Sequence, residues 1–250
     1  MTPPARAVTA AVLALALLAA GGCGGKSSAS TASPASFDFG SNDPRKVTAF
    51  GDSITFGVLE LRVRRLGLTT SNTYPALLQA KLQALDPAWR VVNRGLGGED
   101  TFHGVSRIAS VLAADQPGFV LIMEGTNDAS ECESALAIMG NLASMVNQAR
   151  ARKTIPVLAT VPPNFRNDPC AQDVVDQVNV LIRGFTQSEN VVLAEIFDGM
   201  NDRSLFGQAP DRDPLHPNDR GYAVMADIFY GALLKAVPGG VVAAAQHRRR

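Results

Sequence analysis

A serine that follows a short apolar run is the first residue of this chain with an evident chemical use. Ser53 stands in the segment FGDSITFG at 50–57, directly after the apolar stretch 47–50. The flanking glycines, Gly51 and Gly57, permit positive φ angles and close approach of a substrate. The pattern predicts a serine presented by a sharp turn at the end of a buried strand. The alternative is a polar turn in which the serine and its aspartate bond the local backbone.

Two later segments carry groups that can serve this serine. The segment NRGLGGEDT at 93–101 holds three glycines within four residues, so its N–H groups can face a ligand. The segment GTND at 125–128 contains Asn127, whose side-chain amide can donate to a developing oxyanion. Taken singly, each segment also fits a plain glycine turn, an Asx turn or a helix cap. Their weight lies in the combination.

A histidine near the end of the chain is the candidate base. The segment DPLHP at 213–217 places Asp213 and His216 three residues apart in a turn that two prolines stiffen. The carboxylate can accept from one ring nitrogen while the other nitrogen faces a serine. In isolation, a surface histidine without a catalytic role is the alternative.

Short apolar segments alternate with longer amphipathic ones along most of the chain. We expect strands over 47–50, 90–93, 119–124, 156–161 and 191–196, and helices over 74–85, 103–114, 134–152, 173–185 and 219–234. Because the strands are apolar rather than alternating, the pattern predicts an α/β fold with a mostly parallel five-stranded sheet covered on both faces. In such sheets the ligand site lies beyond the carboxyl ends of the strands, where the candidate residues stand.

Composition limits the classes of function. The chain has 250 residues, 46% hydrophobic and 18% charged, with a net charge of zero, which suits one large domain and provides no field for nucleic acid. The three cysteines and three histidines lack the spacing of a zinc site. We therefore expect no metal and no nucleic-acid partner.

The N-terminal region resembles an export signal. Residues 1–22 contain an apolar run shorter than the roughly 20 residues of a spanning helix. Small residues before Cys23 are similar to a bacterial lipobox, in which that cysteine is lipidated, although Ala20 stands where leucine is usual. Ordinary signal cleavage is the alternative. We expect an export signal over 1–22, a flexible linker over 23–43, a folded domain over 44–238 and a disordered basic tail over 239–250.

In this order, the four polar blocks resemble the SGNH hydrolases, the GDSL esterase and lipase superfamily. The resemblance runs over most of residues 46–236, and Ile54 replaces the leucine that names the family. It implies a three-layer α/β/α sandwich, flavodoxin-like, that hydrolyses esters or thioesters without a cofactor. It also implies a triad of Ser53, Asp213 and His216, and an oxyanion hole formed by the N–H groups of Ser53 and Gly98 with the side chain of Asn127.

Two cysteines follow loops that leave neighbouring strands of the predicted sheet. Cys132 comes after the Asn127 loop, and Cys170 lies in the loop after the next strand. Loops on the same rim of a sheet can meet, and exported proteins form disulfides, so we predict a bond between these two cysteines.

We therefore expect an exported carboxylic-ester hydrolase, a GDSL-type esterase or lipase that acts on lipid or small acyl esters. It would be a monomer, either a cell-envelope lipoprotein whose membrane contact is the lipid on Cys23, or a secreted protein. The alternatives are an O-acetyl deacetylase of envelope or plant polysaccharide, an acyltransferase with the same site, and a tethered binding module with an inactive site. One tryptophan and three tyrosines form no obvious platform for sugar chains, which favours small or lipid esters.

Overall fold

The computed structural model describes residues 37–57, 72–207 and 214–237. The expected export signal, Cys23, the basic tail and Asp213 lie outside these ranges. The first strand begins at Asp43 and the last helix ends at Ala236. No helix in the described ranges combines the length and apolar character needed to cross a bilayer.

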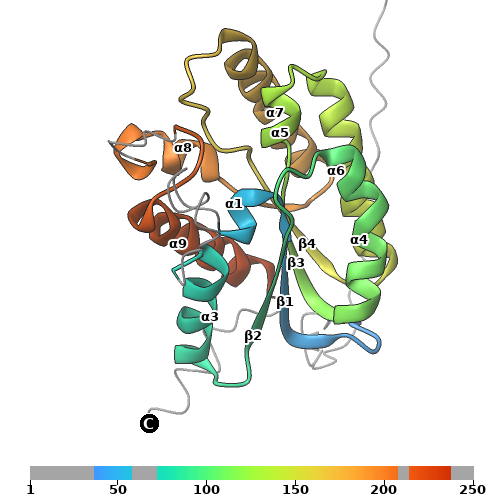
Figure 1. Cartoon of the computed structure of the whole chain (residues 1–250). Coiled ribbons are helices and arrows are strands. Elements are labelled where there is room, and N and C mark those ends of the chain that lie inside the picture. The colour runs from blue at the N-terminus through green and yellow to red at the C-terminus, as the bar shows by residue number, and fades with distance from the viewer. Residues whose placement is uncertain (1–36, 58–71, 208–213, 238–250) are drawn as a thin grey trace, which may run out of the picture. The chain divides into compact units, whose positions relative to one another are not determined.

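A parallel five-stranded sheet forms the centre of the described structure (Figure 1). The strands lie in the order β2-β1-β3-β4-β5, and every neighbouring pair is parallel. Their bounds are β1 Asp43–Gly51, β2 Arg90–Gly95, β3 Pro117–Met123, β4 Ile155–Ala159 and β5 Val192–Ala194. The chain runs from β1 outward to β2 and then returns to the other side of β1. This change of direction lies between β1 and β3, where open α/β sheets form their ligand crevice.

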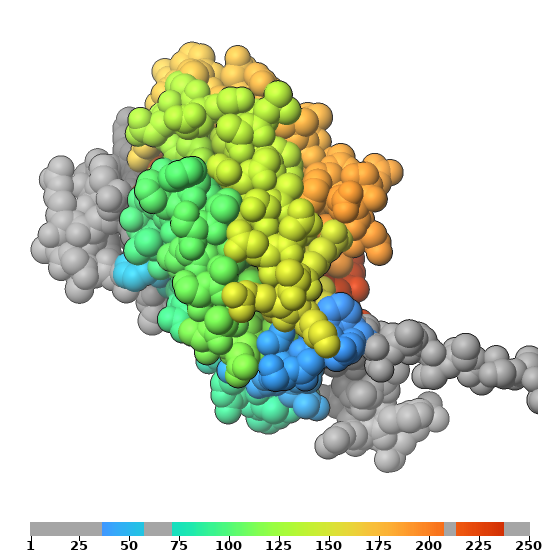
Figure 2. Space-filling view, turned by 90° about the vertical axis from the view of Figure 1, so that its right-hand side faces the viewer, coloured from blue at the N-terminus to red at the C-terminus, as the bar shows by residue number. Residues whose placement is uncertain are grey.

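Helices cover both faces of the sheet, so the expected three-layer α/β/α architecture is confirmed (Figure 1). Helices α3 and α9 lie on one face, and α4, α6 and α7 lie on the other. Figure 2 shows the second face, with α4 and α6 side by side and α7 beyond them. The bounds are α1 Ser53–Phe56, α3 Tyr74–Leu85, α4 Thr101–Asp115, α5 Thr126–Ser130, α6 Ala135–Ala151, α7 Pro169–Ser188, α8 Ile196–Met200, the 3₁₀ turn η1 Arg203–Leu205 and α9 Asp219–Ala236.

Alternation along β1 sends its side chains into two separate cores. Val47 and Ala49 pack with α3 and α9, whereas Phe50 packs with α4 and α6. Successive residues of a strand point to opposite faces, and both faces here are covered. All seven residues of β3 are buried for the same reason. This double burial explains why β3 has no charged or polar side chain, whereas the edge strand β2, which has no buried residue, contains two arginines and an asparagine.

Capping residues set where two helices begin, earlier than the apolar pattern predicts. Helix α4 starts at Thr101 because the Asp100 carboxylate accepts the His103 N–H at 2.8 Å. Helix α7 starts at Pro169, a residue type suited to the first turn, and Asp168 caps it. The prediction for α3 was correct to the residue, and Thr73 caps that helix.

Candidate active site

Ser53 lies at the carboxyl end of β1, as the sequence predicts. It is the first residue of α1, and the residue is 7% exposed. Asp52 caps this short helix by accepting the Ile54 N–H at 2.8 Å. The chain therefore turns from strand to helix at the serine.

Glycine is required where this turn meets its neighbours. A Cβ on Gly95, at the end of β2, would lie 2.0 Å from the Phe56 nitrogen. Gly57 closes α1 at φ 101°, in the left-handed region that favours glycine. The serine's turn thus packs directly against the backbone that leads to Gly98.

His216 approaches the serine from the other end of the fold. Its Nε2 lies 2.9 Å from Ser53 Oγ, across 163 positions of sequence, and the residue is 1% exposed. The histidine's turn is held by the Gly207 N–H, which donates to the His216 carbonyl at 3.0 Å, and by a bridge between Phe206 and Pro217. A base at this distance can take the serine proton.

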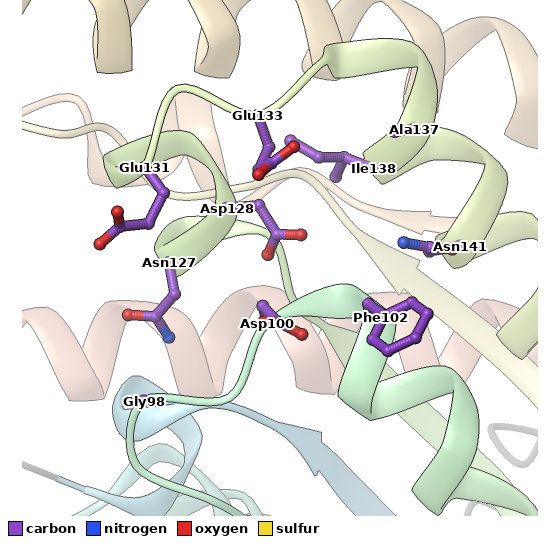
Figure 3. A pocket seen from close by; sticks show the side chains of 10 residues that line it. All are labelled: Gly98, Asp100, Phe102, Asn127, Asp128, Glu131, Glu133, Ala137, Ile138 and Asn141. Atoms are coloured by element: carbon purple, nitrogen blue, oxygen red, sulfur yellow. The ribbon is translucent and has the colours of Figure 1, made fainter.

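Gly98 and Asn127 lie on the two loops beside this pair. Gly98 has φ +81°. The Asn127 side chain points from α5 toward the Gly98 loop, and its Nδ2 donates to the Glu99 carbonyl at 2.7 Å (Figure 3). Within the described ranges, the backbone N–H groups of Ser53 and Gly98 donate no hydrogen bond. Those N–H groups and the second Asn127 amide hydrogen remain available to a ligand.

A pocket of about 720 Å³ begins at Gly98 and Asn127 and continues between α4 and α6 (Figure 3). Ser53 and His216 are not among the residues that line it. Polar and apolar groups share its wall, which is lined by Gly98, Asp100, Phe102, Asn127, Asp128, Glu131, Glu133, Ala137, Ile138 and Asn141. The Asp128 carboxylate is committed to the fold, because it accepts the Thr101 N–H at 3.0 Å and the Thr101 hydroxyl at 2.5 Å.

A buried carboxyl group stands directly before the serine. Burial raises the pKa of Asp52 to about 6, against the opposing effects of its bond from Ile54 and of nearby His216. Its Oδ2 has no hydrogen-bond partner in the described structure. Asp52 therefore changes charge near pH 6.

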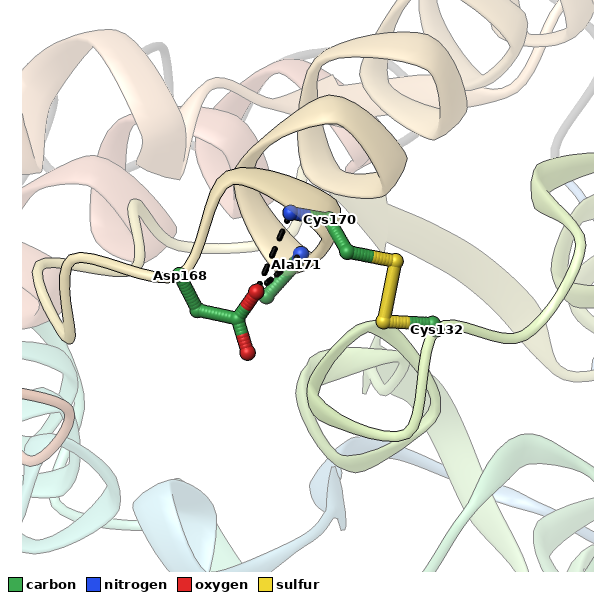
Figure 4. The surroundings of a disulfide bond; sticks show 4 residues. All are labelled: Cys132, Asp168, Cys170 and Ala171. Atoms are coloured by element: carbon green, nitrogen blue, oxygen red, sulfur yellow. Dashed lines mark hydrogen bonds between the residues drawn. A yellow bond between two sulfur atoms is a disulfide. The ribbon is translucent and has the colours of Figure 1, made fainter.

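The predicted disulfide is present. Cys132, in the turn after α5, is bonded to Cys170, in the first turn of α7 (Figure 4). The bond closes a loop across 38 positions of sequence, which in the chain-entropy model stabilises the fold by about 4 kcal/mol. It attaches the α5 segment, which carries Asn127, to a long helix.

Sequence reasoning missed a second group of buried polar residues behind the site. Glu99 pairs with Arg107, and Glu124 is buried beside them. Glu124 is an acidic residue at the end of an otherwise apolar segment, which is a detectable signal. Among the residues that the structure describes, no group of three histidine, cysteine, aspartate or glutamate side chains is arranged to hold a metal ion.

The chain matches the GDSL-like Lipase/Acylhydrolase family over residues 49–224, and it belongs to that family. Lipases and acylhydrolases cleave carboxylic esters, so the family places the chain in the class of ester hydrolases. The fold, with its serine at the end of β1 and its histidine before α9, agrees with the resemblance noted in the sequence.

Individual relatives agree with this assignment. Esterase TesA of Pseudomonas aeruginosa is 36% identical over 102 residues, which span 40% of this chain and 51% of TesA. The chain thus matches about half the length of that relative. A crystal structure of TesA has a TM-score of 0.63 at 25% identity, covering 76% of this chain and 99% of that one. A catalytic mutant of the acetylxylan esterase Axe2 from Geobacillus stearothermophilus has the same fold, with a TM-score of 0.63 at 22% identity, covering 77% of this chain and 95% of that one.

The raised pKa of Asp52 predicts a pH-dependent stability. The folded protein holds the Asp52 proton more tightly than the unfolded chain does. Protonated Asp52 therefore adds its full contribution to the free energy of unfolding below about pH 4, and this contribution is lost as the pH rises through about 6. The loss amounts to roughly 3 kcal/mol. Asp52→Asn keeps an acceptor for Ile54 but removes the titration. Urea unfolding at pH 4 and pH 6.5 should show a smaller difference between the two pH values in the variant than in the native protein. An equal difference in both proteins would show that Asp52 does not titrate in this window.

Proposed function

We propose that this protein hydrolyses carboxylic esters through an acyl-enzyme on Ser53, with His216 as the base and Asp213 as the residue that orients it. The observation that carries the proposal is the 2.9 Å separation of Ser53 Oγ and His216 Nε2, beside two loops with available N–H donors. A serine hydroxyl is a weak nucleophile until a base takes its proton.

In the first half of the reaction, His216 Nε2 takes the Ser53 proton while Oγ attacks the ester carbonyl carbon. The tetrahedral intermediate collapses, and the imidazolium returns the proton to the departing alcohol. In the second half, His216 takes a proton from water as the water oxygen attacks the acyl-enzyme. Collapse then releases the carboxylic acid and restores the Ser53 hydroxyl. Because Nε2 must accept a proton, Nδ1 carries the hydrogen that Asp213 would accept.

The developing negative charge on the carbonyl oxygen requires fixed donors. We assign this role to the N–H groups of Ser53 and Gly98 and to Asn127 Nδ2. These groups lie on the turn after β1, the loop after β2 and the segment after β3, which are neighbouring strands. Donors that are already oriented lower the barrier more than donors that must reorganise during the reaction.

We propose lipid or small acyl esters as substrates. Three apolar side chains are exposed on the segments that carry the site: Phe56 at 46%, Leu96 at 49% and Phe102 at 68%. Exposed apolar side chains near a site suit an apolar acyl group. A second candidate is removal of acetyl groups from a polysaccharide. The carboxylates of Glu131 and Glu133 and the amide of Asn141 in the adjoining pocket favour this candidate, because such groups bind sugar hydroxyls.

The catalytic assignment predicts two different losses of activity. Ser53→Ala should abolish hydrolysis of p-nitrophenyl esters, because no nucleophile remains. Asn127→Ala should reduce kcat by about 100- to 1,000-fold, the usual effect of losing one oxyanion donor. Circular dichroism and thermal unfolding would check that both variants are folded. Native activity in purified Ser53→Ala would refute the assignment.

Substrate class is tested with p-nitrophenyl esters from acetyl to palmitoyl, together with lysophospholipid and acetylated xylan. We expect kcat/KM to rise from acetyl toward longer acyl chains, because a longer apolar chain buries more surface. A strict preference for acetyl, with release of acetate from xylan, would favour the deacetylase instead.

We also propose that the domain acts outside the cytoplasm, as a lipoprotein attached through Cys23. The signal-like segment 1–22 and the disulfide support export, because disulfides persist in oxidising compartments. Intact-mass measurement of the mature protein should give an N-terminal cysteine carrying acyl chains. An unmodified N-terminus downstream of Cys23 would contradict lipidation, and an uncleaved chain would contradict export.

A further inference from the structure

Glu99, the residue after Gly98, is a buried carboxylate held by an arginine. The Glu99 side chain is 1% exposed and the Arg107 side chain is 23% exposed. Arg107 Nε donates to Glu99 Oε1 at 2.6 Å, and Arg107 Nη2 donates to Glu99 Oε2. This two-pronged geometry fixes the orientation of both groups. A buried charge of this kind is tolerated because its partner is in place.

The arginine is itself fixed to the sheet. Its Nη1 donates to the Arg94 carbonyl on β2 at 3.0 Å, and its guanidinium lies over the Phe50 ring on β1 at 4.1 Å. The position of the Glu99 side chain is therefore tied to the edge strand β2, to its neighbour β1 and to α4.

The main chain of the same residue holds the oxyanion loops. The Glu99 carbonyl accepts from Asn127 Nδ2 at 2.7 Å, and the Glu99 N–H donates to the Leu96 carbonyl at 3.2 Å. The Leu96 N–H in turn donates to the Gly51 carbonyl at 2.8 Å. One hydrogen of the Asn127 amide is thus occupied, which sets the direction of the other hydrogen.

A second carboxyl group stands behind the ion pair. Glu124 is 1% exposed, and neither of its oxygens has a hydrogen-bond partner among the described residues. Burial raises the pKa of Glu124 well above its ordinary value, the neighbouring carboxylates of Asp52 and Glu99 raise it further, and Arg107 opposes the rise. The contacts of Arg107 are made with Glu99, since both Glu99 carboxylate oxygens accept from its guanidinium.

We propose that Glu99 and Arg107 are positioning residues for ester hydrolysis, which hold the Gly98 loop in place and direct the Asn127 amide toward the oxyanion. The inference rests on the proposed function, because it needs Asn127 to be an oxyanion donor. Neither side chain touches the substrate. They act through the Glu99 carbonyl and the loop that it anchors.

The physical reason is preorganisation. An oxyanion donor contributes fully only when it points at the oxygen before the charge develops. A misplacement of about 1 Å can reduce the rate by roughly 100-fold. The Gly98 loop contains two adjacent glycines and cannot supply that rigidity from its own backbone. The ion pair supplies it from α4.

The test compares Glu99→Gln with a matched control. Glu99→Gln removes the charge, keeps the shape and leaves the backbone carbonyl in place. We expect kcat for a p-nitrophenyl ester to fall by about 10- to 100-fold with KM changed by less than about threefold, because the lost interaction acts in the transition state. The control is Asp115→Asn, which removes a different buried carboxylate, at the end of α4, that pairs with Arg94. It should lower the melting temperature and leave kcat unchanged.

A double-mutant cycle identifies the route of the effect. If Glu99 acts through Asn127, the double variant Glu99→Gln/Asn127→Ala should turn over at about the rate of Asn127→Ala alone. Losses that multiply would overturn the proposal, as would a Glu99→Gln variant that loses stability but keeps its kcat. If Glu99→Gln fails to fold, Arg107→Lys provides the same comparison, because lysine keeps the charge and loses the fork. A native protein without esterase activity would instead refute the proposed function, so the two failures are distinguishable.

Discussion

The contact between Ser53 Oγ and His216 Nε2 is the interaction on which the arrangement of this molecule depends. The two groups come from the first strand and from the turn before the last helix, so most of the domain must fold before they meet. Tyr74 links these two regions. Its hydroxyl lies 3.0 Å from the Thr55 hydroxyl of α1, and its ring stacks on Phe229 of α9 at 4.7 Å. The packing between α3 and α9 therefore holds the serine's turn against the helix that follows the histidine.

The sheet positions the serine relative to the candidate oxyanion donors. Because all five strands are parallel, the segments after β1, β2 and β3 leave the same edge, and this edge carries Ser53, Gly98 and Asn127. Order in the sheet matters as much as direction. With β1 between β2 and β3, the serine's turn has a donor loop on each side.

Much of this arrangement is predictable from the sequence, for identifiable reasons. Strands buried on both faces are apolar throughout, so a run such as 119–123 is readily recognised as a strand. Chemically active residues in such folds follow strands directly, which makes Ser53, Gly98 and Asn127 candidates. The structure brings Ser53 and His216 within hydrogen-bond distance. Helix α7 was placed four residues too late, because the capping by Asp168 and the proline at 169 outweigh the apolar periodicity.

The ion pair of Glu99 and Arg107 behind the site was not predictable in the same way. The pairing of Glu99 with Arg107 depends on how the Gly98 loop folds against α4, and no local pattern encodes that approach. Taken alone, both residues resemble ordinary surface charges of a helix and a loop. The short helices α1 and α5 were also missed, because four or five residues carry too little periodicity. Tertiary packing, rather than propensity, creates them.

Because Cys132 and Cys170 form a disulfide, the redox conditions under which the chain folds affect the molecule that results. A copy that folds among reducing thiols acquires the same sheet and the same serine, but its α5 segment has no covalent tie to α7. Two preparations of identical sequence, one folded in an oxidising compartment and one in a reducing cytosol, therefore differ in whether this bond is present. Their catalytic properties are comparable only when the oxidation state of the two sulfurs is specified.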